Sequence, residues 1–313
     1  MARPKPWEVD DELWAVIEPH AGTGGQAVMT TQVIRHQVPA DRVSDVQSLV
    51  DDTEARVRKL ETMPSTFNMA LNRALANAKS HCALDPEAVR IETWEACVAA
   101  MQIGSALFRS ATSPEPTIEC LISGKPRTIR STGPHSPVNA GNWLTAFYLA
   151  LVCREGQRLT ELSNVPISLL RESGAVFDEY VYDWVDTLQT YWKQEPGVGD
   201  KLVAAINGTD PGRVEAADRS LMLRILYPPL NLFYRLVGGG SERFNAELVK
   251  ALEWHKEYWT AEESRAAQVS GLVALGPLAM TCLAYDGGVP IEVKSDYIPK
   301  YLLERGRVGD FPT

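Results

Sequence analysis

The amino-acid sequence predicts an all-α protein: an irregular array of helical hairpins, in the manner of an α-solenoid, with a small β-hairpin around residues 117–131. Three observations predict this class. Apolar residues recur every three or four positions through most of the chain, which is the period of a helix with one buried face. Proline and glycine interrupt these stretches at short intervals. Alternation of polar and apolar residues, the period of a strand, is confined to one short segment.

The stretch from residue 140 to residue 192 is expected to form the centre of the array. Its apolar residues, many of them aromatic, repeat at helical spacing in two stripes. The spacing predicts one helix over 143–153 and another over 177–192. A short helix that Pro166 closes is expected to join them, so that three helices connected by tight turns bury their large aromatic side chains together.

Before this centre, a charged amphipathic helix is predicted over 40–60, and after an interruption at Pro64 a helix rich in alanine and leucine is predicted over 65–81. The sequence Asp85-Pro86-Glu87 is a helix-start signal, because proline and acidic side chains favour the first turn. We expect it to open a long helix that continues through Phe108. The segment TIECLI-SGKP-RTIRS that follows has the pattern of a β-hairpin.

After the centre, further helices are predicted at 201–206, 214–237, 242–259 and 267–285. Pro228 and Pro229 are expected to kink or split the second of these, and Pro277 is expected to bend the last. The chain then ends in a short strand-like piece and one amphipathic turn. No fixed period repeats, so the array is predicted to be irregular.

The domain organisation is predicted to be a single helical domain over residues 29–313, preceded by an extension over residues 1–28. The extension contains a helix-start signal followed by a glycine-rich connector. Its first nineteen residues resemble the N-terminal head of IS5-type insertion-sequence transposases. That resemblance stops at Pro19, which indicates a fused remnant with no transposase activity.

Composition limits the classes of function. The formal net charge of −9 argues against nucleic-acid binding, which needs clustered lysine and arginine. The five cysteines show no CxxC spacing and favour a reducing cytoplasm. The N-terminus lacks the pattern of a signal peptide, and the longest apolar run is too short to cross a membrane. We therefore expect a cytoplasmic protein that has no nucleic-acid or membrane partner.

One cluster of carboxylates suggests a metal-dependent alternative. Asp178, Glu179, Asp183 and Asp186 are spaced so that they could share a helix face and bind Mg²⁺, as in helical diphosphate-processing enzymes such as terpene synthases. A helical secondary-metabolite tailoring enzyme is a related alternative. The competing interpretation is a solvated helix face. No nucleotide-binding, nucleophile-elbow or zinc motif is present, so the sequence predicts no catalytic or cofactor-binding residue.

The same helix supplies a candidate surface for a protein partner. Glu179, Tyr182, Asp183 and Asp186 are expected to lie on the face opposite the apolar stripe, and exposed tyrosine flanked by acids is typical of protein-binding surfaces. Tyr258, on a second aromatic-rich helix, is the fifth candidate. Nearby His255 is interpreted as a hydrogen-bonded core residue, and Glu92 and Glu95 are interpreted as helix surface.

Whole phrases of the chain resemble the Imm49 family of bacterial immunity proteins, which is abundant in actinomycetes. The phrases are RIETWEACVAAMQIGSALF (90–108), GNWLTAFYLALVCREGQRLTEL (141–162), FDEYVYDWVDTLQTYW (177–192), LYPPLNLFYRL (226–236) and LEWHKEYWTAEE (252–263). The resemblance covers about residues 29–313. It implies a mostly helical cytoplasmic protein without a cofactor, which binds a cognate toxin of a polymorphic toxin system and neutralises it. It implies no particular binding residue.

Overall fold

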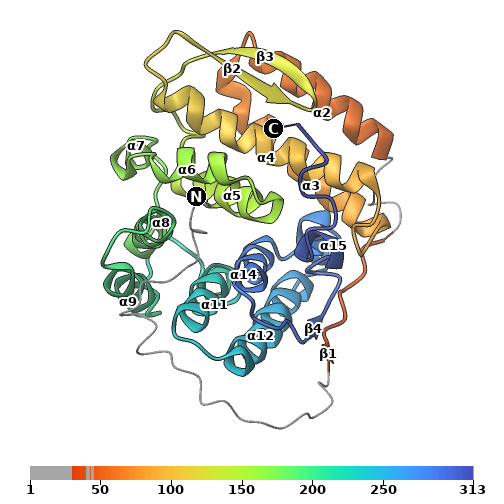
Figure 1. Cartoon of the computed structure of the whole chain (residues 1–313), viewed down its shortest axis with the longest axis vertical. Coiled ribbons are helices and arrows are strands. Elements are labelled where there is room, and N and C mark those ends of the chain that lie inside the picture. Colours follow the sequence, from red (N-terminus) through yellow and green to blue (C-terminus); the bar gives the residue numbers. More distant parts are fainter. Residues whose placement is uncertain (1–29, 40–42, 44–45, 313) are drawn as a thin grey trace, which may run out of the picture.

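The computed structural model describes residues 30–39, 43 and 46–312, and most of these residues are helical (Figure 1). The predicted all-α class with one small β-hairpin is confirmed. The proposed extension over residues 1–28, with its transposase-like head, lies outside the described residues.

The first helices of the array are α2 (Val46–Leu60) and α3 (Phe67–Leu84), joined by the single-turn η2 (Pro64–Thr66). Helix α3 packs between α2 and α4 (Ile91–Thr112). The start predicted for α4 is wrong, because Asp85 does not open that helix. Its carboxylate accepts hydrogen bonds from the backbone N–H groups of the two residues before α4, at 3.1 and 2.8 Å. These hydrogen bonds stabilise the turn between α3 and α4.

The centre of the array consists of α5 (Ala140–Cys153), α6 (Gly156–Ser163), α7 (Ile167–Arg171) and α8 (Glu179–Trp192). Trp143 is fully buried, stacks on Phe147 with ring centroids 4.8 Å apart, and donates its indole N–H to the Leu162 carbonyl at 2.9 Å. The predicted inward orientation of these aromatic residues is confirmed. The short helix α7, directly after Pro166, was not predicted.

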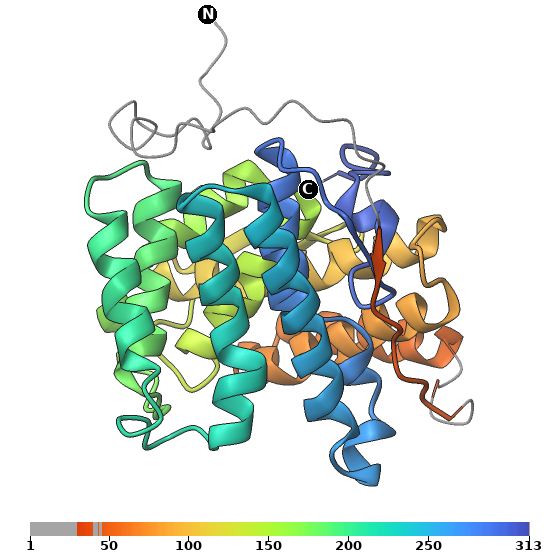
Figure 2. The ribbon, with the colours of Figure 1, turned by 90° about the horizontal axis from the view of Figure 1, so that it is seen from below.

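Four more helical segments follow α9 (Val198–Gly208): α10 (Arg219–Leu221), the π-helical η3 (Met222–Leu226), α11 (Tyr227–Val237) and α12 (Ser241–Thr260). The interruption predicted at Pro228 and Pro229 is present in a specific form. Both prolines lie in the first turn of α11, which continues directly from η3, so the regular α-helical hydrogen bonding is replaced by π-helical bonding just before them. Helices α8, α9, α11 and α12 stand side by side in Figure 2.

The apolar stretch near the C-terminus divides into α13 (Glu263–Ala266), η4 (Val269–Leu272) and α14 (Leu275–Asp286), and α15 (Lys300–Leu303) follows later. The prediction of one helix over 267–285 bent at Pro277 is wrong. Pro277 lies in the first turn of α14, so it marks the start of that helix and does not bend it.

Two small strand pairs complete the fold. Strands β2 (Thr117–Ile122) and β3 (Lys125–Arg130) form the predicted antiparallel hairpin, and its two-residue turn places Ser123 and Gly124 at φ of 54° and 69°. Strands β1 (Thr31–Gln32) and β4 (Val293–Lys294) pair in parallel, so the first described strand lies beside a segment from the last part of the chain. The buried apolar side chains form one cluster that extends from Val33 to Leu303.

Candidate functional site

The carboxylates predicted to share the face of α8 have separate structural roles. Asp178 precedes α8. Its carboxylate accepts hydrogen bonds from the backbone N–H groups of Glu215, Ala216 and Ala217 at 2.7, 2.9 and 3.0 Å. Burial acts to raise the pKa of Asp178, but these hydrogen bonds outweigh it and the pKa is lowered. Asp178 therefore anchors the loop before α10.

Tyr182 is not on an exposed face, and this corrects the sequence-based expectation. Its side chain belongs to the buried core at 5% exposure. Phe177 meets its ring edge-on at 6.2 Å between centroids, and the Arg171 guanidinium lies 3.9 Å from the ring centroid. Arg171 also pairs with Glu179, which stays exposed. The segment between α7 and α8 thus covers Tyr182 and leaves Glu179 at its outer edge.

Asp183 and Asp186 are both half-buried. Asp186 pairs with Lys201 of α9 at 2.8 Å. Asp183 forms no ion pair in the part of the chain that the structure describes. Burial raises the pKa of Asp183, and the neighbouring charges of Glu179 and Asp186 raise it further. The charge of Arg171 acts on Asp183 only to lower this pKa. Because these acids are paired or point to different neighbours, they do not converge on one point. Among the described residues, no three His, Cys, Asp or Glu side chains are grouped to hold a metal ion, so the structure gives no support to the Mg²⁺ alternative based on Asp178 and these three acids.

Tyr258 lies on α12 and is half-buried. The Arg265 guanidinium lies 4.2 Å from its ring centroid, and Trp259 meets it edge-on at 5.6 Å. His255, one turn earlier on α12, is buried and pairs through Nε2 with the Gly271 carbonyl at 2.8 Å, as predicted for a core histidine. With Tyr182 buried and Tyr258 partly covered, the predicted partner-binding residues do not form an exposed aromatic patch.

A different acidic surface is formed by the first three helices. A cavity of about 760 Å³ lies between α2, α3 and α4, and the turn of the β-hairpin and the C-terminal residues Phe311 and Pro312 also line it. We call it the acidic groove. Four carboxylates line it, two from α2 and two from α4: Asp51, Glu54, Glu92 and Glu95.

Most of this negative charge is uncompensated. Glu54 pairs with Lys125 at 3.0 Å and with Arg127 at 2.7 Å. The other three carboxylates, Asp51, Glu92 and Glu95, are exposed and form no ion pair within the part of the chain that the structure describes. His81 also lines the groove, but burial lowers its pKa despite the opposing effect of Glu92, so it adds no positive charge at neutral pH.

Exposed apolar side chains lie in the groove and in the cavity next to it. Val50 lines it and is 39% exposed, and Leu84 lines an adjoining cavity and is 53% exposed. Val89 and Ile91, in the turn that leads into α4 and at its start, are also exposed. Apolar residues next to a charged rim are typical of protein interfaces. The acidic groove is therefore the candidate site for binding a basic partner.

The sequence did not reveal this groove. Glu92 and Glu95 fit the pattern of a solvated helix surface, and they are indeed exposed. Their place opposite Asp51 depends on how α2 packs relative to α4, and no local pattern encodes that packing. The one available signal was an apolar residue, Val50, directly before the acidic residues Asp51 and Asp52 of α2.

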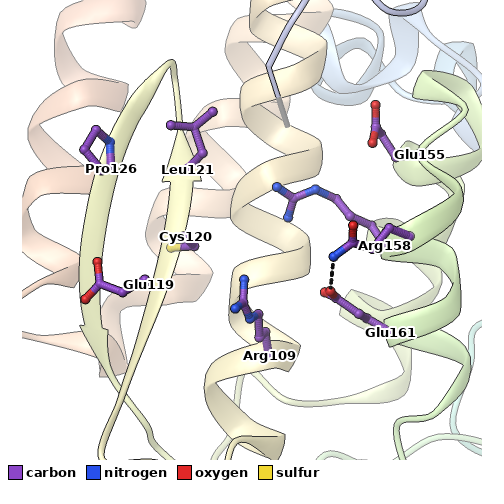
Figure 3. A pocket seen from close by; sticks show the side chains of 9 residues that line it. Arg109, Glu119, Cys120, Leu121, Pro126, Glu155, Arg158 and Glu161 are labelled. Atoms are coloured by element: carbon purple, nitrogen blue, oxygen red, sulfur yellow. Dashed lines mark hydrogen bonds between the residues drawn. The ribbon is translucent and has the colours of Figure 1, made fainter.

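A smaller cavity of about 280 Å³ lies between the β-hairpin, α4 and α6 (Figure 3). Arg158 extends from α6 toward α4, where Arg109 lies, and its side chain is largely buried. Burial lowers the pKa of Arg158, whereas Glu161 and Glu155 act to raise it. Because acids and bases oppose one another here, this cavity lacks the one-sided charge of the acidic groove.

Among the described residues, one stretch, Val269–Asp286, is long and apolar enough to cross a membrane by length and composition, which differs from the sequence-based expectation that no apolar run is long enough. It comprises η4 and α14, and 67% of it is buried against the rest of the protein, as expected for core helices of a globular fold.

Comparison with known proteins gives one positive result. Comparisons with curated proteins and with solved structures return no significant match. A family model described as Immunity protein 49 matches residues 85–302, which is 218 of the 313 residues. The match begins just before α4 and ends within α15, so it includes one wall of the acidic groove and excludes α2. This chain belongs to the Imm49 family of immunity proteins.

Proposed function

We propose that this protein neutralises a toxin by binding it, without catalysis, and that the acidic groove receives a basic segment of the toxin. Membership of an immunity-protein family supports the role. The observation that carries the location is the uncompensated charge of Asp51, Glu92 and Glu95 beside exposed apolar side chains. Complementary charge accelerates association and selects the partner, and apolar contacts supply buried area. The bound protein then occludes that surface of the toxin.

The two walls of the groove differ in their relation to the family. Helix α4 lies within the matched region, whereas α2 precedes it. We infer that α4 supplies the contacts shared by the family and that α2 adjusts the groove to one toxin. The proposed location is the cytoplasm, in keeping with five cysteines that are all buried and unpaired.

The test is charge reversal on the groove with a matched control. Glu92→Lys/Glu95→Lys reverses two exposed acids of α4, one of them in its first turn. Glu242→Lys/Glu253→Lys makes the same change in net charge on α12 and also alters one first-turn acid. The two variants therefore experience the same helix-dipole penalty, which is about 0.3–1 kcal/mol for a first-turn position.

The assay measures binding to a toxin domain of the native host that co-purifies with this chain, together with rescue of growth in bacteria that express that toxin. We expect the α4 variant to bind at least tenfold more weakly and to lose rescue, and the α12 variant to match the wild type. Affinity should also fall as ionic strength rises. Equal binding by the two variants would refute the groove as the site. Failure of the wild type to bind would refute the function.

A further inference from the structure

A third cavity lies at the centre of the array, away from the acidic groove. Its volume is about 270 Å³, and α3, α5, α8, η3, α11, α12 and α14 all contribute to its lining. Most of the lining is apolar, including Leu75, Leu144, Val181, Leu226 and Leu230. An apolar cavity of about 150 Å³ already binds benzene. This cavity is therefore large enough for a small organic molecule with a ring or a short chain.

The charged side chains that line this cavity are all cationic. No aspartate or glutamate contributes to it, although the chain carries a net charge of −9. The cationic side chains Lys79 and Arg224 do contribute. Arg224 is paired with Glu257 at 3.2 Å, so Lys79 is the cation without a carboxylate partner in the described part of the chain. The cavity thus presents positive charge and no acid.

Two hydrogen-bond donors in the lining have no partner among the described residues. The Tyr180 hydroxyl is buried and unpaired in a side chain that is only 2% exposed. The indole N–H of Trp259 is likewise buried and unpaired. An indole N–H can only donate, so it can be satisfied only by an acceptor. Leaving such groups unpaired inside a protein costs free energy, which a ligand carrying acceptor oxygens would recover.

The donors at one end of the cavity lie close together. Lys79 donates to the Ser270 carbonyl at 2.9 Å, and the Gly271 carbonyl next along the chain pairs with His255 at 2.8 Å. The rings of His255 and Trp259 are 6.1 Å apart between centroids. Burial lowers the pKa of Lys79 to about 8, so the ammonium stays mostly charged at pH 7. This end of the cavity therefore combines an ammonium with a free N–H donor.

We propose that this cavity binds a small amphipathic carboxylate, with the carboxylate at Lys79 and the Trp259 indole N–H and the apolar body among the leucines. The ammonium supplies charge and the indole N–H supplies a directed hydrogen bond. The unpaired Tyr180 hydroxyl offers a donor to a second oxygen of the ligand. This binding is a property separate from toxin neutralisation, because the lining shares no residue with the acidic groove.

The test uses 3-phenylpropionate and octanoate as probes, with 3-phenylpropanamide as the matched neutral compound, in calorimetry on the full-length chain at pH 7. We expect saturable one-to-one binding of the carboxylates and at least tenfold weaker binding of the amide. Lys79→Met should weaken carboxylate binding at least tenfold and leave amide binding unchanged. Lys250→Met, on the exposed surface of α12, is the control and should bind both as the wild type does.

A second variant separates a ligand contact from a structural role. Trp259→Phe removes an N–H that has no partner among the described residues, so its loss should weaken carboxylate binding severalfold more than it weakens amide binding. Trp254→Phe, on the same helix and outside the cavity lining, should change neither affinity. Absence of saturable binding up to millimolar carboxylate, or equal binding of acid and amide, would overturn the proposal.

Discussion

Arg154 provides the sharpest test of how the fold is held together. It follows α5 with a positive φ of 58°, and its guanidinium reaches the ends of two other helices. It donates to Asp286 at 3.1 Å and to the carbonyls of Leu302 and Leu303 at 2.7 and 2.6 Å. The Arg154 and Asp286 side chains are 6% and 7% exposed. This single side chain therefore connects α5, α14 and α15.

Replacing Arg154 by Met should destabilise the protein substantially. Removing one partner of a buried ion pair costs about 3–5 kcal/mol, because the remaining charge stays buried. Asp286 keeps a second partner, Arg305 at 2.9 Å, so we expect the lower end, about 3 kcal/mol. That is a large share of a total stability of about 5–15 kcal/mol. An unfolding entropy of about 2.1 cal/mol/K per residue gives about 0.65 kcal/mol/K for a chain of 313 residues, so the melting temperature should fall by roughly 5 °C.

Arg73→Met is the matched control. Asp52 is also shared by two arginines, Arg73 at 2.6 Å and Arg56 at 3.2 Å, but all three side chains are about one third exposed. Solvent weakens such pairs, so the control should lose less than about 1 kcal/mol. Urea unfolding followed by fluorescence and circular dichroism measures both losses. If Arg154→Met costs no more than Arg73→Met, desolvation cancels the buried interactions and our reasoning fails.

Two further predictions concern the helices around the central cavity. Burial lowers the pKa of His255 to about 3, so the unfolded chain binds its proton first as pH falls below about 6.5. The free energy of unfolding, measured by urea titration, should therefore decrease from pH 6.5 toward pH 3. The decrease should be smaller for His255→Asn than for the wild type. The same pH dependence for both proteins would contradict this prediction. A Cβ at Gly208 would lie 2.6 Å from the Tyr180 Cβ, whereas one at Gly199 on the same helix α9 meets nothing within 4 Å. Gly208→Ala should lower the free energy of unfolding by about 1–3 kcal/mol, whereas Gly199→Ala should leave it unchanged or raise it. Calorimetric melting measures both effects. Equal effects of the two substitutions would argue against close packing of α9 on α8.

Local sequence patterns determined most of the secondary structure. Helical periodicity predicted the central helices, and the residues after Ile122 predicted the hairpin turn, because Gly124 readily adopts the positive φ that this turn requires. The helix predicted over 267–285 was wrong because proline can have two effects on a helix. Proline bends a helix when it lies in the interior and starts one when it lies in the first turn. Pro277 is in the first turn because the chain folds back at Val273 and Ala274, and only tertiary packing decides that.

The candidate sites depended on tertiary structure throughout. Tyr182 had the spacing of an exposed residue, but the segment carrying Phe177 folds over it, and no periodicity within α8 encodes that contact. The acidic groove joins Asp51 of α2 to Glu92 of α4, and both helices pack on α3, so the charge becomes concentrated only when the three helices assemble. The sequence by itself therefore determined the helices, the acidic balance and the family resemblance. The fold decided which acids stay unpaired and which aromatic residues enclose the central cavity, because both depend on neighbours that are distant along the chain.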